Sequence, residues 1–126
     1  MKLDLKELIA KLTNTPMVVE EGTSGIWTYR KWSNGIAECW GKFTRSSSLA
    51  ASSHVAIGGA LPSLFINNAP IATGCGGGQA QPNAFLAYTN VYGSSGAYGI
   101  DCYIRNNGGS ACASQWAYFY VKGTWK

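Results

Sequence analysis

Apolar and polar residues alternate along two neighbouring segments, residues 26–32 and residues 36–43. Alternation with a period of two is typical of β-strands that bury one face. Residues 33–35, between the two segments, read Ser-Asn-Gly, and Asn-Gly favours a hairpin because both residues tolerate a positive φ angle. We therefore predict an antiparallel hairpin here, and it holds three of the five tryptophans.

The length of the hairpin loop decides which side chains share a face. A loop of three residues, 33–35, pairs Arg30 with Glu38 and separates the apolar positions from the polar ones. A loop of two residues, Asn34 and Gly35, mixes them on both faces, so we predict the longer loop. The core face then carries Trp27, Tyr29, Ala37, Cys39, Gly41 and Phe43, with Lys31 near the tip, and the opposite face carries Thr28, Arg30, Trp32, Glu38, Trp40 and Lys42.

Most of the remaining chain consists of short apolar segments separated by Gly, Asn, Ser and Pro. This pattern predicts an all-β fold, an antiparallel β-sandwich of jelly-roll type. The predicted strands are residues 17–20, 26–32, 36–43, 54–57, 64–66, 84–91, 99–105 and 115–121. We expect turns at residues 44–53, 67–70, 74–81, 92–96 and 106–109. The glycine-rich residues 74–78 lack the Gly-Lys-Ser/Thr end of a phosphate-binding loop, so we interpret them as a flexible turn.

A helical period occurs in residues 3–13, which Asn14 and Pro16 bring to an end. A helix this short is marginal in water, so its apolar face must be buried. That face could pack on the same chain, or on copies of itself as the end of a parallel coiled coil. If the helix packs on copies of itself, the chain divides into a helical neck, residues 1–14, and a β-sandwich head, residues 15–126. The apolar face of the helix consists of Leu5, Leu8, Ile9 and Leu12.

The composition fits one β-rich domain of 126 residues. Charged residues make up only 13% of the chain, so we expect another copy to cover part of its surface. The net charge of +4 comes from basic residues that are scattered along the sequence. Nucleic-acid binding favours a clustered basic stripe instead, so we expect no nucleic-acid partner.

The cysteines and the lone His54 do not predict a metal site. Cys39, Cys75, Cys102 and Cys112 include no Cys-x-x-Cys pair, so we expect no metal and no cofactor. The sequence shows no secretion signal, which predicts folding in a reducing cytoplasm with free thiols. It also has no apolar run of about 20 residues, so we expect no membrane insertion.

Groups suited to catalysis are scarce in this sequence. Glu20 and Glu21 are adjacent, so in a strand they would point to opposite faces. Glu38 has Arg30 across the predicted hairpin, which favours its ionised form and makes it a poor general acid. We therefore expect a protein that is not an enzyme and has no catalytic residues.

Aromatic side chains offer the most plausible binding chemistry, because sugar rings stack their C–H faces on Trp and Tyr while their hydroxyls need polar partners. Two groups of residues on predicted strands combine both kinds of side chain. Each group could bind a saccharide, and each could equally form a subunit contact, since Trp, Tyr and Arg are enriched at interface cores. The first group is Arg30, Trp32, Glu38 and Trp40, and the second is Asp101, Tyr103 and Arg105.

Residues 21–41, EGTSGIWTYRKWSNGIAECWG, resemble a segment that recurs in the C-terminal heads of tail proteins from phages and prophages of Gram-positive bacteria. The shared pattern is W-x-Y-x-K-W-x-x-G-x-A-E-x-W-G, and residues 120–126, YVKGTWK, are similar to the aromatic strand that closes such heads. Residues 44–114 match nothing in that family. The matching positions are Trp27, Tyr29, Lys31, Trp32, Gly35, Ala37, Glu38, Trp40 and Gly41.

The resemblance implies a homotrimer located in the virion tail and assembled in the bacterial cytoplasm. The helix would then be the end of a stalk, with Leu5, Leu8, Ile9 and Leu12 as the trimerisation residues. The implied function is host attachment, through recognition of a cell-wall or surface polysaccharide by a receptor-binding head. The alternative is a purely structural tail or baseplate protein that contacts other tail proteins. The family supplies no catalytic or binding residues for this chain.

Overall fold

The chain folds into two β-sheets and one short helix. The structure is a computed structural model that describes residues 4–66, 68–79, 85–94 and 96–126. Every pair of neighbouring strands runs antiparallel, so the expected all-β antiparallel fold is confirmed. The described elements are α1 (Leu5–Thr13), β1 (Val18–Ser24), β2 (Trp27–Trp32), β3 (Ile36–Arg45), β4 (His54–Ala60), β5 (Ile71–Gly78), β6 (Phe85–Ser94), β7 (Ala97–Asn106) and β8 (Gln115–Thr124).

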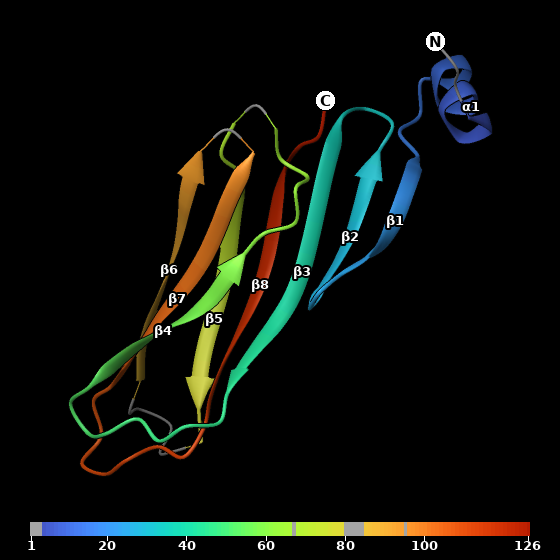
Figure 1. Ribbon diagram of the computed structural model, residues 1–126. Coiled ribbons are helices and arrows are strands. Elements are labelled where there is room, and N and C mark those ends of the chain that lie inside the picture. Colours follow the sequence, from blue (N-terminus) through green and yellow to red (C-terminus); the bar gives the residue numbers. More distant parts are fainter. Residues whose placement is uncertain (1–3, 67, 80–84, 95) are drawn as a thin grey trace.

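The strands form a larger sheet in the order β1-β2-β3-β8-β5 and a smaller sheet in the order β4-β7-β6. The two sheets lie face to face (Figure 1). The chain runs through β3, β4 and β5 and returns through β6, β7 and β8. On its return β8 pairs with β3, β7 pairs with β4, and β6 lies against β5. This nested pairing resembles one long hairpin rolled around a common core.

The core lies between the two sheets and is built from every second residue of the facing strands. In β8, for example, buried side chains alternate with half-buried or exposed ones along most of the strand. The rings of Trp27, Phe43 and Phe119 meet in this core with centroid separations of 5.7, 6.1 and 5.9 Å. The indole Nε1 of Trp27 also donates to the carbonyl oxygen of Ala60 at 3.0 Å, which ties the larger sheet to β4 of the smaller one.

The four cysteines are free thiols, as expected. Cys39, Cys102 and Cys112 are buried, whereas Cys75 on β5 is exposed. Burial raises the pKa of the Cys39 thiol to about 12, so this side chain stays protonated and packs as a small apolar group.

The predicted hairpin of β2 and β3 is confirmed in its register. Arg30 lies opposite Glu38 and Lys31 opposite Ala37, which corresponds to the three-residue loop. Gly35 in that loop has a φ angle of 92°, a value that glycine adopts without strain. The predicted core face is correct, because Trp27, Ala37 and Cys39 are buried and Tyr29 and Phe43 pack against the core.

The prediction of a glycine-rich turn at residues 74–81 is wrong for its described part, because β5 (Ile71–Gly78) forms the edge of the larger sheet. Residues 80 and 81 lie outside the described residues. Gly74, Gly76 and Gly78 face inward, and a Cβ atom at Gly76 would lie 2.8 Å from Cδ1 of Ile104. The glycines therefore allow β5 to approach the side chains of β6 and β7 closely. They recur at every second position, as residues on one face of a strand do.

The predicted strand at residues 64–66 is also wrong. Leu64 lies in a turn in which its backbone N–H donates to the carbonyl oxygen of Pro62 at 2.7 Å. Leu64 and Phe65 are nonetheless buried, and Phe65 packs against Gly123 near the end of β8. The apolar run therefore closes one end of the sandwich instead of joining a sheet. Residues 92–94, predicted as part of a turn, belong to β6.

The helix α1 begins at Leu5, where the Asp4 carboxylate accepts from the backbone N–H of Glu7 at 2.8 Å, and ends at Asn14 with a φ angle of 55°. The predicted start at residue 3 lies outside the described residues. Figure 1 shows α1 beyond β1, beside the edge of the larger sheet and away from the smaller one. Within the described part of the chain, no helix has the length and apolar character needed to cross a membrane.

The apolar face of α1 points away from the body of the chain. Ala10, on the other face, is the buried residue of this helix. The four apolar side chains, which we call the leucine ridge, are all exposed, Leu5 and Leu12 the most. Their exposed fractions are 71% for Leu5, 44% for Leu8, 38% for Ile9 and 78% for Leu12.

Candidate functional site

The outer face of the larger sheet carries a row of aromatic side chains, which we call the aromatic face. Alternation along β2, β3 and β8 turns these residues outward, and the register of β3 with β8 places Trp40 opposite Tyr120 and Thr44 opposite Trp116. Tyr118 and Tyr120 are 48% and 41% exposed. The aromatic face consists of Trp32, Trp40, Trp116, Tyr118 and Tyr120.

Glu38 lies on the aromatic face, and two aromatic side chains hold its carboxylate in place. Its Oε1 accepts from the indole Nε1 of Trp32 at 3.1 Å, and its Oε2 accepts from the hydroxyl of Tyr120. The hydrogen bond to Glu38 raises the pKa of Tyr120 to about 12. The tyrosine hydroxyl therefore remains a donor across the neutral and mildly basic range, and the carboxylate is positioned before any ligand arrives.

Arg30 lies opposite Glu38 in the hairpin, as predicted, but its guanidinium pairs with a different carboxylate. The Nε of Arg30 lies 3.4 Å from the carboxylate of Glu21, which is the neighbour of Arg30 on β1. The guanidinium also lies over the ring of Trp40, 5.2 Å from its centroid. Arg30 thus forms an ion pair with β1 and a cation–π contact with Trp40. The carboxylate of Glu38 instead accepts hydrogen bonds from Trp32 and Tyr120.

A groove of about 290 Å³ opens beside Trp32 and Glu38. Lys122 lies opposite Glu38 in the register of β3 and β8, so an ammonium group and a carboxylate line the same groove. Asn34 uses its Oδ1 to accept from the backbone N–H of Ile36 at 3.2 Å, which leaves its amide NH₂ as a donor. The groove is lined by Pro16, Trp32, Asn34, Ile36, Glu38 and Lys122.

Sequence reasoning found Trp32 and Glu38 but missed the contributions of Asn34, Tyr120 and Lys122. The sequence pattern places Asn34 in the hairpin turn and gives no further role to it. Tyr120 and Lys122 alternate along the last strand, which indicates that they share a face. Their placement beside Glu38, however, depends on the pairing of β3 with β8, for which the sequence contains no local signal.

The second predicted group, Asp101, Tyr103 and Arg105, lies on the outer face of the smaller sheet. The ring of Tyr103 stacks on Tyr88 with a centroid separation of 5.0 Å, and the Nε of Arg105 donates to Asn107 at 2.8 Å. This face is on the opposite side of the sandwich from Glu38. The two predicted groups are therefore separate surfaces and do not form one site.

Comparison with known proteins does not identify a family for this chain. No family model matches it, and no match was found among curated proteins or among solved structures. The resemblance of residues 21–41 to phage tail heads therefore stays a prediction. Among the described residues, histidine, cysteine, aspartate and glutamate do not gather in groups of three that could hold a metal ion. The site is thus characterised by its own geometry, as a groove beside a row of aromatic rings.

Proposed function

We propose that this chain is the head of a homotrimeric phage tail protein and that it attaches to a bacterial surface glycan. In this proposal it is a binding module and not an enzyme. The observation that carries the proposal is the groove beside Trp32, in which an aromatic wall, a carboxylate and an ammonium group converge.

This combination of groups matches the chemistry of a sugar ring. The indole of Trp32 offers a surface for the C–H face of the ring, and Glu38 offers an acceptor for its hydroxyls. Lys122 and Asn34 add donors. Because Trp32 and Tyr120 already hold the carboxylate, a ligand does not have to order it on binding. The volume of about 290 Å³ corresponds to the lower end of small-ligand pockets and suits a single sugar unit.

The exposed leucine ridge supports the trimeric part of the proposal. A helix of nine residues is marginal by itself, and its own chain covers the polar side instead of the apolar one. Three ridges packed side by side would bury these residues as the end of a coiled coil. Three copies would also combine weak sites into tight attachment by multivalency.

The nested pairing of the strands supports the jelly-roll part of the proposal. Jelly rolls distribute a rolled hairpin over two sheets. The pairing of β3 with β8 and β4 with β7, with β5 beside β6, follows that plan. β1 and β2 would then be an extension of the larger sheet that connects the head to the neck.

A binding assay on intact cells tests the function. Labelled protein is added to a panel of Gram-positive bacteria, with and without their surface polysaccharide. We expect binding that depends on the polysaccharide and falls at least about tenfold in Trp32→Ala and in Glu38→Gln. Glu38→Gln keeps the shape of the side chain, so its loss of binding would report on the carboxylate.

The matched control for this assay is Tyr88→Ala. Tyr88 is an exposed aromatic residue, but it lies on the smaller sheet, so its removal should leave binding unchanged. Equal losses in Tyr88→Ala and Trp32→Ala, or binding that survives removal of the polysaccharide, would contradict the proposed site.

A purely structural role in the tail or baseplate is the second candidate. Ile71 on β5 is 79% exposed and flanks the aromatic face. An exposed aliphatic side chain beside exposed aromatic ones is typical of a surface that binds another protein. If this role is correct, the protein will bind no bacterial surface but will bind purified tail proteins. Ile71→Ser will then weaken that binding, whereas it will leave glycan binding unchanged.

A further inference from the structure

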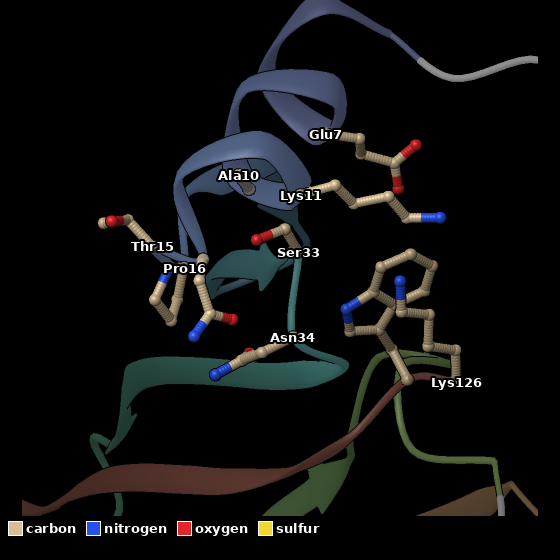
Figure 2. Close-up of a pocket in the computed structure, with 10 residues that line it drawn as sticks. Glu7, Ala10, Lys11, Thr15, Pro16, Ser33, Asn34 and Lys126 are labelled. Carbon is tan, nitrogen blue, oxygen red and sulfur yellow. The ribbon is translucent and has the colours of Figure 1, made fainter.

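A second and larger cavity lies between α1 and the body of the chain (Figure 2). Its volume is about 530 Å³. The helix contributes Glu7, Ala10 and Lys11 to one wall, and the end of the chain contributes Trp125 and Lys126 to another. The cavity is thus lined by the polar side of α1, opposite the leucine ridge.

The indole of Trp125 forms a rigid wall of this cavity. Its Nε1 donates to the carbonyl oxygen of Trp32 at 2.8 Å, and its backbone N–H donates to the carbonyl oxygen of Gly35 at 2.9 Å. The ammonium groups of Lys31 and Lys126 lie 5.2 and 5.0 Å from the centroid of its ring. Trp125 therefore offers a fixed aromatic surface in a cationic environment.

Two of the cations at this cavity have no carboxylate partner. Lys31 is paired with Glu20 at 3.4 Å, but within the described ranges neither Lys11 nor Lys126 has a carboxylate oxygen within 4.0 Å. Figure 2 shows both side chains extending toward the same region, Lys11 from the helix and Lys126 from the end of the chain. Glu7 also lines the cavity, so its lining side chains carry one negative and two positive charges, and this net positive charge favours an anionic ligand.

The cavity adjoins the groove beside Trp32. Pro16 and Asn34 line both spaces, so one ligand could pass from the groove across these residues into the cavity. The groove is lined by one carboxylate, Glu38, and one ammonium group, Lys122, whereas the cavity is lined by the carboxylate of Glu7 and two ammonium groups, Lys11 and Lys126. We therefore expect the groove to favour an uncharged ligand and the cavity to favour an anionic one.

We infer that the cavity binds an acidic sugar, one that carries a carboxylate or a phosphate group, next to an uncharged sugar in the groove. The inference rests on the proposed function and makes it more specific, because the glycan is then an acidic polysaccharide. The acidic group pairs with Lys11 and Lys126, and the sugar ring stacks on Trp125.

A titration of the ¹⁵N-labelled protein tests this inference. The probes are glucose, glucuronic acid and glucose 6-phosphate, observed through the indole N–H signal of Trp125. We expect both acids to shift this signal and glucose to leave it in place. The acid with the larger shift identifies carboxylate or phosphate as the preferred group. The variant Lys11→Gln with Lys126→Gln should weaken acid binding about three- to tenfold.

The control variant is Lys6→Gln, which removes the same charge from an exposed part of α1 that does not line the cavity. It should bind the acids as the unchanged protein does. Absence of a Trp125 shift with either acid, or equal weakening by Lys6→Gln, would overturn the inference. Trp32→Ala separates the two proposals, because it should abolish binding in the groove and leave the response of Trp125 to the acids intact.

Discussion

The β-sandwich buries its apolar residues, whereas the helix α1 exposes them. In the sandwich, alternate residues of the facing strands point inward, and side chains such as Ile100, Ile104 and Val121 are fully buried. In α1 the apolar residues point outward, and Leu12 is 78% exposed. The sandwich thus buries its own core, whereas the helix leaves its apolar surface exposed.

This difference follows from where each helix residue lies around the axis. Residues three and four positions apart share a helical face, and Glu7, Ala10, Lys11 and Asn14 form the face turned toward the body. The leucine ridge lies half a turn away from them. The body therefore contacts the polar side of α1 and contributes little to covering its apolar side, which is the arrangement expected of a helix whose partner is a separate chain.

The largest effect should come from a tryptophan inside the sandwich. Trp27→Ala removes a ring that is 3% exposed and bonded to Ala60, and we expect the free energy of unfolding to fall by about 3–5 kcal/mol. Trp40→Ala removes a half-buried ring from the aromatic face and should cost about 1 kcal/mol. Urea unfolding measures both, and equal losses would mean that the aromatic face belongs to the stabilising core.

An intermediate effect is expected where β5 approaches the smaller sheet. Gly76→Val places methyl groups against Ile104 and Cys102, whose atoms lie within 2.9 Å of the position of a Cβ atom. Overpacking of this kind should lower the free energy of unfolding by about 1–3 kcal/mol. Gly109→Ala, at a position with no neighbour within 4 Å, is the control and should change little. An unchanged Gly76→Val protein would mean that β5 does not pack this closely.

The smallest effect on the stability of one subunit should come from the leucine ridge. The double substitution Leu8→Asn and Leu12→Asn touches exposed side chains, so it should change the unfolding free energy of an isolated subunit by less than about 0.5 kcal/mol. The same change should dissociate the proposed trimer, and light scattering would then give a mass near 13.4 kDa. Unsubstituted protein that already scatters as a single subunit would exclude self-association through the ridge.

Local sequence patterns predicted the elements whose geometry depends on near neighbours. The hairpin register followed from the Ser-Asn-Gly loop and the alternation around it, and the pairing of Arg30 with Glu38 in that register confirms it. The leucine ridge followed from a helical period in the same way. Both signals depend on residues only a few positions apart, which set φ and ψ angles and side-chain direction directly.

The candidate site could be predicted only in part, because most of its contacts join distant parts of the chain. Trp32 and Glu38 are six residues apart, and the predicted hairpin already placed them on one face. Tyr120 is 82 residues from Glu38 in the sequence, and only the pairing of β3 with β8 brings them together. For the same reason, the hairpin register correctly placed Arg30 opposite Glu38 but did not show that Arg30 forms its ion pair with Glu21 of β1.

The sequence by itself determined which segments are strands or helix in most of the chain, and which side chains share a face of each. The tertiary structure alone decided that residues 71–78 form a strand, that the two predicted binding groups lie on opposite sides of the sandwich, and that α1 turns its leucine ridge away from the body. The physical reason is the distance along the sequence between the residues that interact. Backbone geometry and side-chain alternation are set by adjacent residues, whereas sheet order and the packing of elements are set by close contacts across the whole chain.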